Sequence, residues 1–315
     1  MQIIVTGGAG FLGQRLAKAL LKSNVAFKEL ILADIVMPLN PVNDGRVTCL
    51  QVDLSKEDAA KKLVTSKTAI VFHLAAVVSS HAEKDFDIGY KVNLDITRLL
   101  LEACRHQNPD IKFIFSSSLA VYGGKLPAVV NDTTAVTPRS SYGTQKAMGE
   151  LLVNDYSRKK FVDGRVLRLP TICVRPGRPN LAASSFVSSI IREPLNGEQA
   201  ICPVSPDLTL WLSSPDTIIE NLMKGAVLDA GAFDGWRTVN LPGIGVTVKE
   251  MLASLQKIAG KTTVDKVEFI PDAAINNIVS SWPGAIDNTL ALQLDFKVDN
   301  NFDDFITQFL KNNKQ

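Results

Sequence analysis

The chain has 315 residues, 46% of them hydrophobic and 21% charged, which is ordinary for a globular α/β protein with a sizeable core. A formal net charge of +2 gives no electrostatic reason to expect a nucleic acid or an anionic membrane surface as a partner. The four cysteines and three histidines lack metal-ligand spacing, so neither a metal site nor a disulfide framework is predicted. No leader and no apolar membrane span is evident, so a cytoplasmic location is expected.

The first predicted element is a buried strand at residues 2–6, which runs into the segment Thr6-Gly7-Gly8-Ala9-Gly10-Phe11-Leu12-Gly13. A strand, a glycine turn and a helix in this order open a dinucleotide-binding βαβ unit. Gly7 then makes the tight turn, Gly10 lets a pyrophosphate approach the backbone, and Gly13 lets the helix lie close to the strand. The N-terminus of the helix is expected to bind the pyrophosphate.

An acidic residue follows the second predicted strand, at 28–33. Asp34 lies roughly twenty residues after the glycine segment, where a carboxylate accepts hydrogen bonds from the ribose diol of a dinucleotide. The same carboxylate repels the 2′-phosphate of NADP. The sequence therefore predicts NAD as the cofactor, and the alternative is a surface aspartate in a turn.

Strands and helices alternate through the first half of the chain. The clearest helix has its apolar residues on one face, at Val92, Ile96, Leu99, Leu100 and Ala103. Further strands are predicted at 47–52, 69–74, 111–116 and 164–170. This alternation predicts a Rossmann-type, doubly wound parallel sheet with helices on both sides, whose ligands bind beyond the carboxyl ends of the strands.

Past Pro170 the alternation fades and the predicted elements become short. Helices are expected at about 214–229 and 247–259, and a last one carries an apolar face from Phe302 onward. We expect an NAD-binding Rossmann domain at 1–175, with a return at about 206–235. Residues 176–205 and 236–315 are expected to form a smaller, discontinuous α/β region that binds the substrate.

Two residues on one predicted helix have the chemistry of a general base. Tyr142 and Lys146 are four positions apart, which places them on the same helix face. A lysine ammonium beside a phenol favours the phenolate, so the pKa of Tyr142 is expected to fall from its ordinary value near 10. Ser118, at the end of an apolar strand, supplies a hydroxyl that can hold a substrate oxygen while Tyr142 takes its proton.

Six motifs in order resemble those of the extended short-chain dehydrogenases/reductases. They are the glycine segment at 6–13, Val52-Asp53-Leu54, His73-Leu74-Ala75-Ala76, Val92-Asn93, Ser116-Ser117-Ser118 and Tyr142-x-x-x-Lys146. The resemblance implies that Ser118, Tyr142 and Lys146 are catalytic, and that Asn93 props the active-site helix. It implies NAD contacts from Gly7, Gly10, Phe11, Leu12, Gly13, Asp34, Asp53, Leu54, Leu74, Ala75, Ala76, Asn93, Tyr142 and Lys146. His73 is interpreted as a packed, hydrogen-bonded residue of a buried strand.

Most members of that family act on nucleotide-sugars, and two departures weigh against such a substrate. Thr171 stands where those enzymes carry an asparagine that helps hold the substrate, and 209–216 lacks their Arg-Asp-Phe pattern. The segments 174–180 and 278–284 are instead similar to a sugar-acid branch of the family. That branch oxidises the C2 hydroxyl of a four-carbon sugar acid to a 2-keto acid with NAD.

A sugar acid needs a cation for its carboxylate and donors for its hydroxyls. An arginine binds a carboxylate through two parallel charge-assisted hydrogen bonds. Arg175 is the first candidate and Arg178 the second, and the alternative for Arg175 is an ion pair with an internal acid. Ser79, after the fourth strand, is expected to contact the substrate together with Ser118 and Tyr142.

Three other functions stay open at this point. A nucleotide-sugar epimerase would use bound NAD to take and return a hydride. A dehydrogenase could act on another sugar acid, such as a uronate. A non-catalytic NAD-binding regulator is disfavoured, because it has no need of a base. Related enzymes often pair through helices near 91–107 and 142–160, so the resemblance implies a homodimer.

Overall fold

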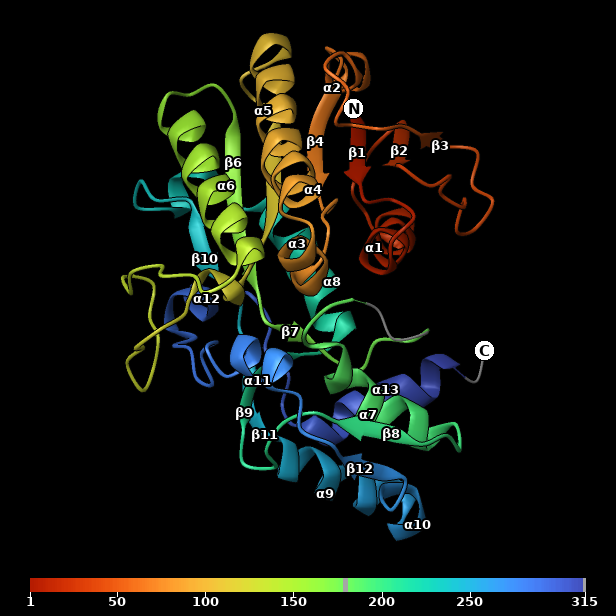
Figure 1. Ribbon diagram of the computed structural model, residues 1–315. Helices are drawn as coiled ribbons and strands as arrows, with labels where there is room; N and C mark the ends of the chain where they lie inside the picture. The colour runs from red at the N-terminus through yellow and green to blue at the C-terminus, as the bar shows by residue number, and fades with distance from the viewer. Residues whose placement is uncertain (178–180, 314–315) are drawn as a thin grey trace.

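Seven strands form the central sheet of the computed structural model, which describes residues 1–177 and 181–313 (Figure 1). In spatial order they are β10 (Thr238–Asn240), β6 (Asp163–Leu169), β5 (Lys112–Ser118), β4 (Thr68–His73), β1 (Gln2–Thr6), β2 (Glu29–Asp34) and β3 (Val47–Gln51). Each neighbouring pair runs parallel. The Rossmann-type fold is confirmed, and the predicted strands agree with the observed ones to within two residues.

The inner strands are continuous apolar runs such as Ile3-Ile4-Val5, whose successive side chains point to opposite faces, so the sheet is buried on both faces. Ile3 packs with Leu16 of α1 (Phe11–Lys22) and Ile218 of α8 (Pro215–Val227) on one face. Ile4 packs on the other face, in a layer that Figure 1 shows in front of the sheet. That layer contains α2 (Ala59–Leu63), α3 (Ser79–Lys84), α4 (Phe86–Tyr90), the π-helical turn η1 (Lys91–Asp95), α5 (Ile96–Gln107) and α6 (Ser141–Arg158).

The rest of the chain builds a second, smaller part below the carboxyl ends of the strands (Figure 1). Its strands are β7 (Thr171–Ile172), β9 (Thr209–Ser213) and β11 (Ile244–Thr247) in one sheet, and β8 (Ala200–Cys202) and β12 (Val267–Phe269) in another. Its helices are α7 (Ser185–Leu195), α9 (Val248–Ala259), α10 (Lys261–Val264), α11 (Ala273–Val279) and α13 (Phe302–Asn313). Phe186, Met251 and Phe305 lie in its separate core.

The chain crosses between the two parts at places that differ from the predicted ones. The expected return at 206–235 is made by α8, whereas β9 joins the second part because its Leu210 and Leu212 pack in that core. The strand β10, beyond the expected return, pairs with β6. The short elements η2 (Leu119–Val121), η3 (Ala230–Ala232) and α12 (Thr289–Gln293) complete the structure.

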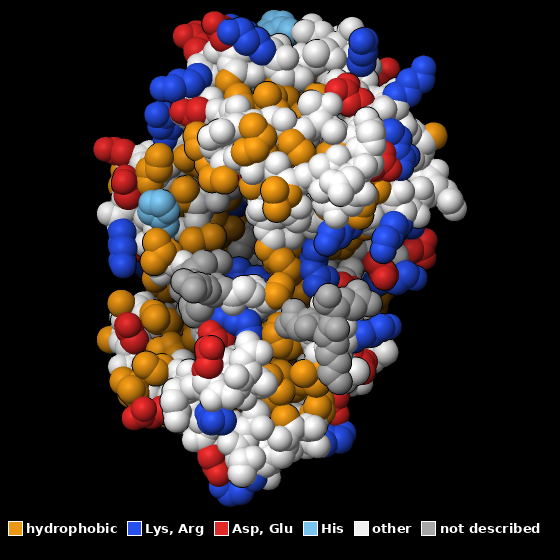
Figure 2. Space-filling model, turned by 90° about the vertical axis from the view of Figure 1, so that its right-hand side faces the viewer, with side chains coloured by type: hydrophobic (Ala, Val, Ile, Leu, Met, Phe, Trp, Pro, Cys, Tyr) orange, Lys and Arg blue, Asp and Glu red, His pale blue; other side chains and the backbone are white. Residues whose placement is uncertain are grey.

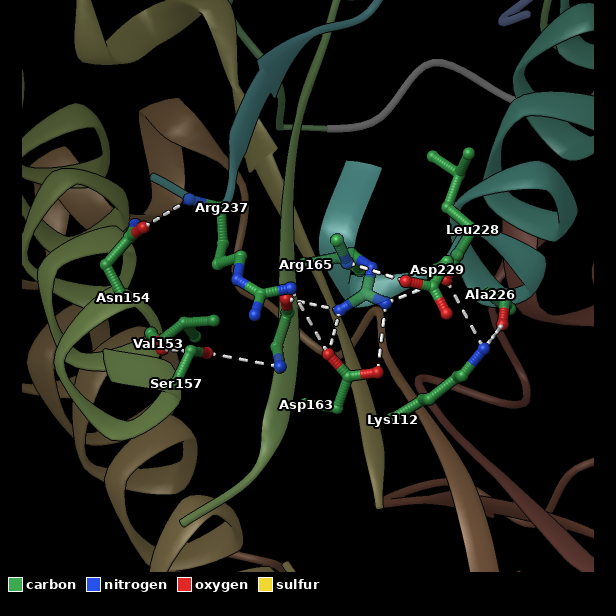
Figure 3. A network of polar contacts seen from close by, with 12 residues as sticks. Lys112, Val153, Asn154, Ser157, Asp163, Arg165, Ala226, Leu228, Asp229 and Arg237 are labelled. Atoms are coloured by element: carbon green, nitrogen blue, oxygen red, sulfur yellow. Dashed lines mark hydrogen bonds and ion pairs between the residues drawn. The ribbon is translucent and has the colours of Figure 1, made fainter. Parts of the chain in front are cut away.

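A buried polar network at the amino end of β6 ties α6, α8 and β10 to the sheet (Figure 3). Arg165, which has no exposed surface, pairs with Asp163 and donates to the carbonyl of Leu228 at 2.8 Å, just beyond α8. The backbone N–H of Arg237 donates to Oδ1 of Asn154 on α6 at 2.7 Å. These contacts anchor the helix that carries the predicted base. Within the described ranges, no helix is long and apolar enough to span a membrane.

Candidate active site

A cavity of about 210 Å³ lies at the carboxyl ends of β4, β5 and β6. Figure 2 shows the surface hollowed between the two parts of the molecule, with Lys and Arg side chains beside the hollow. Eight predicted site residues line the cavity: Leu12, Leu74, Ala76, Ser79, Ser118, Tyr142, Lys146 and Arg175. Its wall also includes Ser116, Ser117, Thr171, Ala182, Ser184 and Trp282. Arg178, the second candidate for the carboxylate, lies outside the described residues.

The glycine turn between β1 and α1 is too crowded for side chains. Gly7 has a φ of +72°, and a Cβ on Gly13 would lie 2.2 Å from the carbonyl oxygen of Gly7. A Cβ on Gly8, to which the sequence assigns no role, would lie 2.8 Å from Cβ of Leu32. Gly10 caps α1 without a side chain, so the first N–H groups of the helix are open to an anion.

Asp34, the residue predicted to bind the ribose, lies directly beside this turn. Asp34 ends β2, and its Oδ2 accepts a hydrogen bond from the N–H of Ala9 at 3.0 Å. Asp53, predicted near the adenine, accepts hydrogen bonds from the N–H and the hydroxyl of Ser55, at 3.0 and 2.6 Å. Its neighbour Leu54 is buried. The acidic groups therefore follow β2 and β3, along one edge of the sheet.

The start of α6 fixes the position of the predicted base. The Ser140 hydroxyl accepts a hydrogen bond from the N–H of Gly143 at 3.1 Å and caps the helix. A Cβ on Gly143 would lie 2.1 Å from the carbonyl oxygen of Ala120, so only glycine lets α6 begin this close to the end of β5. Tyr142 is thereby brought into one cavity with Ser118.

The lysine of the pair is held by the neighbouring strand. Lys146 is buried, and its Nζ donates to the carbonyl oxygen of Ser116 at 2.7 Å. The same Nζ lies 4.7 Å from the ring centre of Phe115 and 5.8 Å from that of Tyr142. The ammonium thus lies over the face of the Tyr142 ring, as the four-residue spacing predicts.

The predicted direction of the Tyr142 pKa is wrong. Burial raises the pKa of Tyr142 to about 12, opposed by a hydrogen bond with Ser118 and by the charge of Arg175. Burial also lowers the pKa of Lys146 to about 7, opposed by the charge of Glu150. The sequence shows the spacing of the pair but not its burial, and burial disfavours the charged form of both groups.

Arg175 brings into the cavity a positive charge that no carboxylate of residues 1–177 or 181–313 compensates. Its backbone is fixed, because its N–H donates to Oγ of Ser188 at 3.0 Å and its carbonyl accepts from Arg192 at 2.7 Å. Burial lowers the pKa of Arg175, and the charged or polar groups that also shift it are Cys173, Arg192 and Tyr142. No carboxylate is among them in the described part of the chain, so an anion from solution is a suitable partner.

Ser79 and Asn93 hold backbone segments around the cavity. The hydroxyl of Ser79 accepts a hydrogen bond from the N–H of Ala183 at 2.9 Å, and its proton stays available for a ligand. Asn93 accepts from the N–H of Val77 at 2.9 Å and donates to Oε1 of Gln145 at 2.8 Å. Asn93 therefore joins the segment after β4 to α6, the helix that the resemblance expects it to prop.

Comparison with known proteins agrees with this geometry. The model of the NAD dependent epimerase/dehydratase family matches residues 3–213. The chain belongs to this family. It is 57% identical over 312 residues to D-erythronate dehydrogenase of Haemophilus influenzae, covering 99% of each chain. It is 49% identical over 319 residues to D-erythronate dehydrogenase of Cupriavidus necator, covering 99% of this chain and 98% of that one.

A solved structure of the family has the same fold over nearly its full length. It is a nucleoside-diphosphate-sugar epimerase from Agrobacterium tumefaciens, with a TM-score of 0.92 and 39% identity. The match covers 97% of this chain and 92% of that one. The resemblance inferred from the motifs is confirmed, and with it NAD as the cofactor. The crowded glycine turn, the open N-terminus of α1 and Asp34 fit this cofactor.

Some residues that line the cavity have no site role assigned to them by the sequence. Trp282 and Ser184 reach the cavity only through the packing of the second part. Thr171 lines the cavity at the position where the sequence shows a departure from the nucleotide-sugar pattern. Gln145 accepts the hydrogen bond of Asn93, and its place in the helix turn between Tyr142 and Lys146 is a sequence signal for a role near the site.

Proposed function

We propose that this protein is an NAD-dependent dehydrogenase that oxidises the C2 hydroxyl of D-erythronate to give 2-dehydro-D-erythronate. The observation that carries the proposal is the near full-length identity of 57% and 49% to two D-erythronate dehydrogenases. The cavity supports it independently, since it combines hydroxyls, the Tyr142–Lys146 pair and an arginine that has no acidic partner among the described residues.

The residues of the cavity have separate roles in the proposed reaction. Arg175 binds the carboxylate, and Ser79 donates to a substrate hydroxyl. Ser118 and Tyr142 hydrogen-bond the C2 hydroxyl, and Oη of Tyr142 takes its proton as the carbonyl forms. Because burial raises the pKa of Tyr142, the phenolate that takes this proton needs a positive charge nearby, and Lys146, close to the Tyr142 ring, supplies it. The chemistry that bound NAD would supply is acceptance of the hydride from C2.

The cofactor is proposed to lie along the carboxyl edge of the sheet. The open N-terminus of α1 would hold the pyrophosphate, and Asp34, beside the glycine turn, would accept hydrogen bonds from the adenosine ribose. Asp53, Leu54, Ala75 and the other positions given by the resemblance complete the proposed contacts. A cytoplasmic homodimer is part of the same proposal, and light scattering on the purified protein tests the dimer.

Formation of NADH tests the proposed reaction. We expect absorbance at the NADH band to rise with NAD and D-erythronate, and not with NADP, because Asp34 repels the 2′-phosphate. L-threonate and uronates serve as matched acids of other configuration and length. If no acid gives NADH while a nucleotide-sugar is epimerised, the second candidate, an epimerase like the Agrobacterium tumefaciens relative, is the correct function.

A further inference from the structure

A chain of buried and part-buried hydrogen bonds, joined through the residue Asn93, runs beneath the segment 74–77, which leads from β4 into the cavity wall. The N–H of Ala75 donates to Oγ1 of Thr6 at 3.3 Å, and this oxygen lies 2.7 Å from Nδ1 of His73. On the other side of the ring, Nε2 of His73 lies 3.0 Å from Oγ1 of Thr97. The Thr97 hydroxyl donates to the carbonyl of Asn93 at 2.9 Å.

The protons along this chain determine the form of the His73 ring. The single hydroxyl proton of Thr97 is used on the carbonyl of Asn93, so Oγ1 of Thr97 can only accept from His73. Nε2 of His73 therefore carries a proton. With Nδ1 unprotonated, the hydroxyl of Thr6 donates to it while its oxygen accepts from Ala75. The opposite tautomer would leave Nε2 and Oγ1 of Thr97 facing each other without a proton.

The surroundings of the ring exclude the remaining form, the imidazolium. His73 is 1% exposed, and its ring lies 5.8 Å from the ring centres of Phe113 and Phe115. Burial and the positive charge of Lys146 together lower the pKa of His73 to about 3. At neutral pH the ring is thus uncharged, with its one proton on Nε2.

The far end of the chain returns to the same segment. The side chain of Asn93 accepts from the N–H of Val77 at 2.9 Å and donates to its carbonyl at 3.2 Å. Its amide also donates to Gln145 on the active-site helix at 2.8 Å. Ala75 and Val77, at the two ends of one short segment, are therefore linked through the His73 ring.

We propose that His73 is a positioning residue, whose neutral Nε2–H tautomer holds the segment 74–77 in the shape that receives the middle of NAD. Thr6 precedes the glycine turn and Asn93 contacts α6, so the ring connects both to this segment. The proposal goes beyond a packed histidine, because it requires one ring nitrogen to donate and the other to accept. It rests on the proposed cofactor contacts of Ala75 and Ala76.

Nitrogen-15 NMR of the histidine rings tests the hydrogen-bond chain without cofactor or substrate. The protein has three histidines, so the His73 signals are assigned as those missing from a His73→Gln variant. At pH 7 we expect one protonated nitrogen, Nε2, and one unprotonated nitrogen, Nδ1. A proton on Nδ1, alone or together with Nε2, would overturn the proposal. This result is independent of whether the protein oxidises D-erythronate.

Calorimetric NAD binding tests the coupling to the cofactor segment. His73→Phe keeps a flat ring but removes the hydrogen bonds of Thr6 and Thr97 to that ring, and we expect the Kd for NAD to rise roughly tenfold. His73→Gln supplies one donor and one acceptor and should restore most of the affinity. Phe72→Leu, on the same strand but in the opposite core layer, is the matched control.

The variants separate positioning from loss of stability. Phe72→Leu should lower the unfolding midpoint while the folded protein keeps its NAD affinity. Wild-type NAD affinity in His73→Phe, or an equal loss of affinity in Phe72→Leu, would contradict the proposed role. If His73→Phe does not fold, the affinity of His73→Gln and the ring protonation of the wild type decide the question.

Discussion

Replacement of Arg175 by methionine tests how the protein recognises an acid. The guanidinium lines the cavity, and none of the groups that shift its pKa is a carboxylate in the described residues. A substrate carboxylate would therefore be its first acidic partner. Methionine keeps an unbranched, apolar side chain but removes the charge and both parallel hydrogen bonds.

The expected loss follows from the burial of this guanidinium. A hydrogen bond to a charged group contributes roughly 1.5–3 kcal/mol, which corresponds to a factor of about 10 to 150 in affinity. Because Arg175 is only partly exposed and two hydrogen bonds are lost at once, we expect the upper part of this range, roughly a hundredfold rise in KM for the acid. Removing a partly buried charge that has no acidic partner in the described part of the chain should not lower the thermal stability.

Steady-state NADH formation with varied D-erythronate measures this change. Arg175→Lys is the control, because it keeps the charge but loses the planar guanidinium that makes two parallel hydrogen bonds. Its KM for the acid should lie between those of the wild type and Arg175→Met. Calorimetry should show the same NAD affinity in all three proteins. A KM for the acid that is unchanged in Arg175→Met would refute the assignment, and a lost NAD affinity would place the arginine at the cofactor instead.

Three further changes have defined outcomes. Tyr142→Phe should fold and bind NAD but turn over roughly 10²–10⁴ times more slowly, and steady-state rates close to wild type would exclude it as the base. Glu150→Gln leaves the buried guanidinium of Arg168 without its carboxylate, and urea unfolding should show a free energy of unfolding lower by about 3–5 kcal/mol. Asp155→Asn, which breaks an exposed ion pair with Arg158, is the control and should change the free energy of unfolding little. Burial holds the pKa of His73 at about 3 in the folded chain, below its ordinary 6.5, so the unfolded chain binds this proton first as the pH falls. The contribution of His73 to the free energy of unfolding is complete above pH 6.5 and declines by about 1.4 kcal/mol per pH unit toward pH 3. Urea unfolding of the His73→Gln variant should lack this part of the pH dependence.

The parts of the site that depend on local geometry can be predicted from the sequence. The glycine turn needs positive φ and close backbone contacts, so Gly7 and Gly13 mark it directly. Asp34 follows because parallel strands end at one edge of the sheet. Tyr142 and Lys146 need only one helix turn to share a face.

Packing over long distances decides the rest of the site, and the sequence does not show it. Trp282 reaches the cavity from the end of the chain because α11 packs into the second core. The short strand β9 joins that core instead of the main sheet. The sequence does not predict this, because the few apolar residues of β9 are compatible with either core. The pKa of Tyr142 rises rather than falls because the phenol is buried, which spacing alone does not indicate.

Transfer of deuterium from C2 tests the central claim most directly. D-erythronate deuterated at C2 is incubated with NAD and the protein, and the reduced cofactor is examined by mass spectrometry. If Tyr142 acts as the base and the hydride leaves C2, the deuterium appears on the cofactor, with one equivalent of 2-dehydro-D-erythronate. Deuterium that stays in the sugar acid or enters the solvent, with an unlabelled cofactor, would contradict hydride transfer from C2.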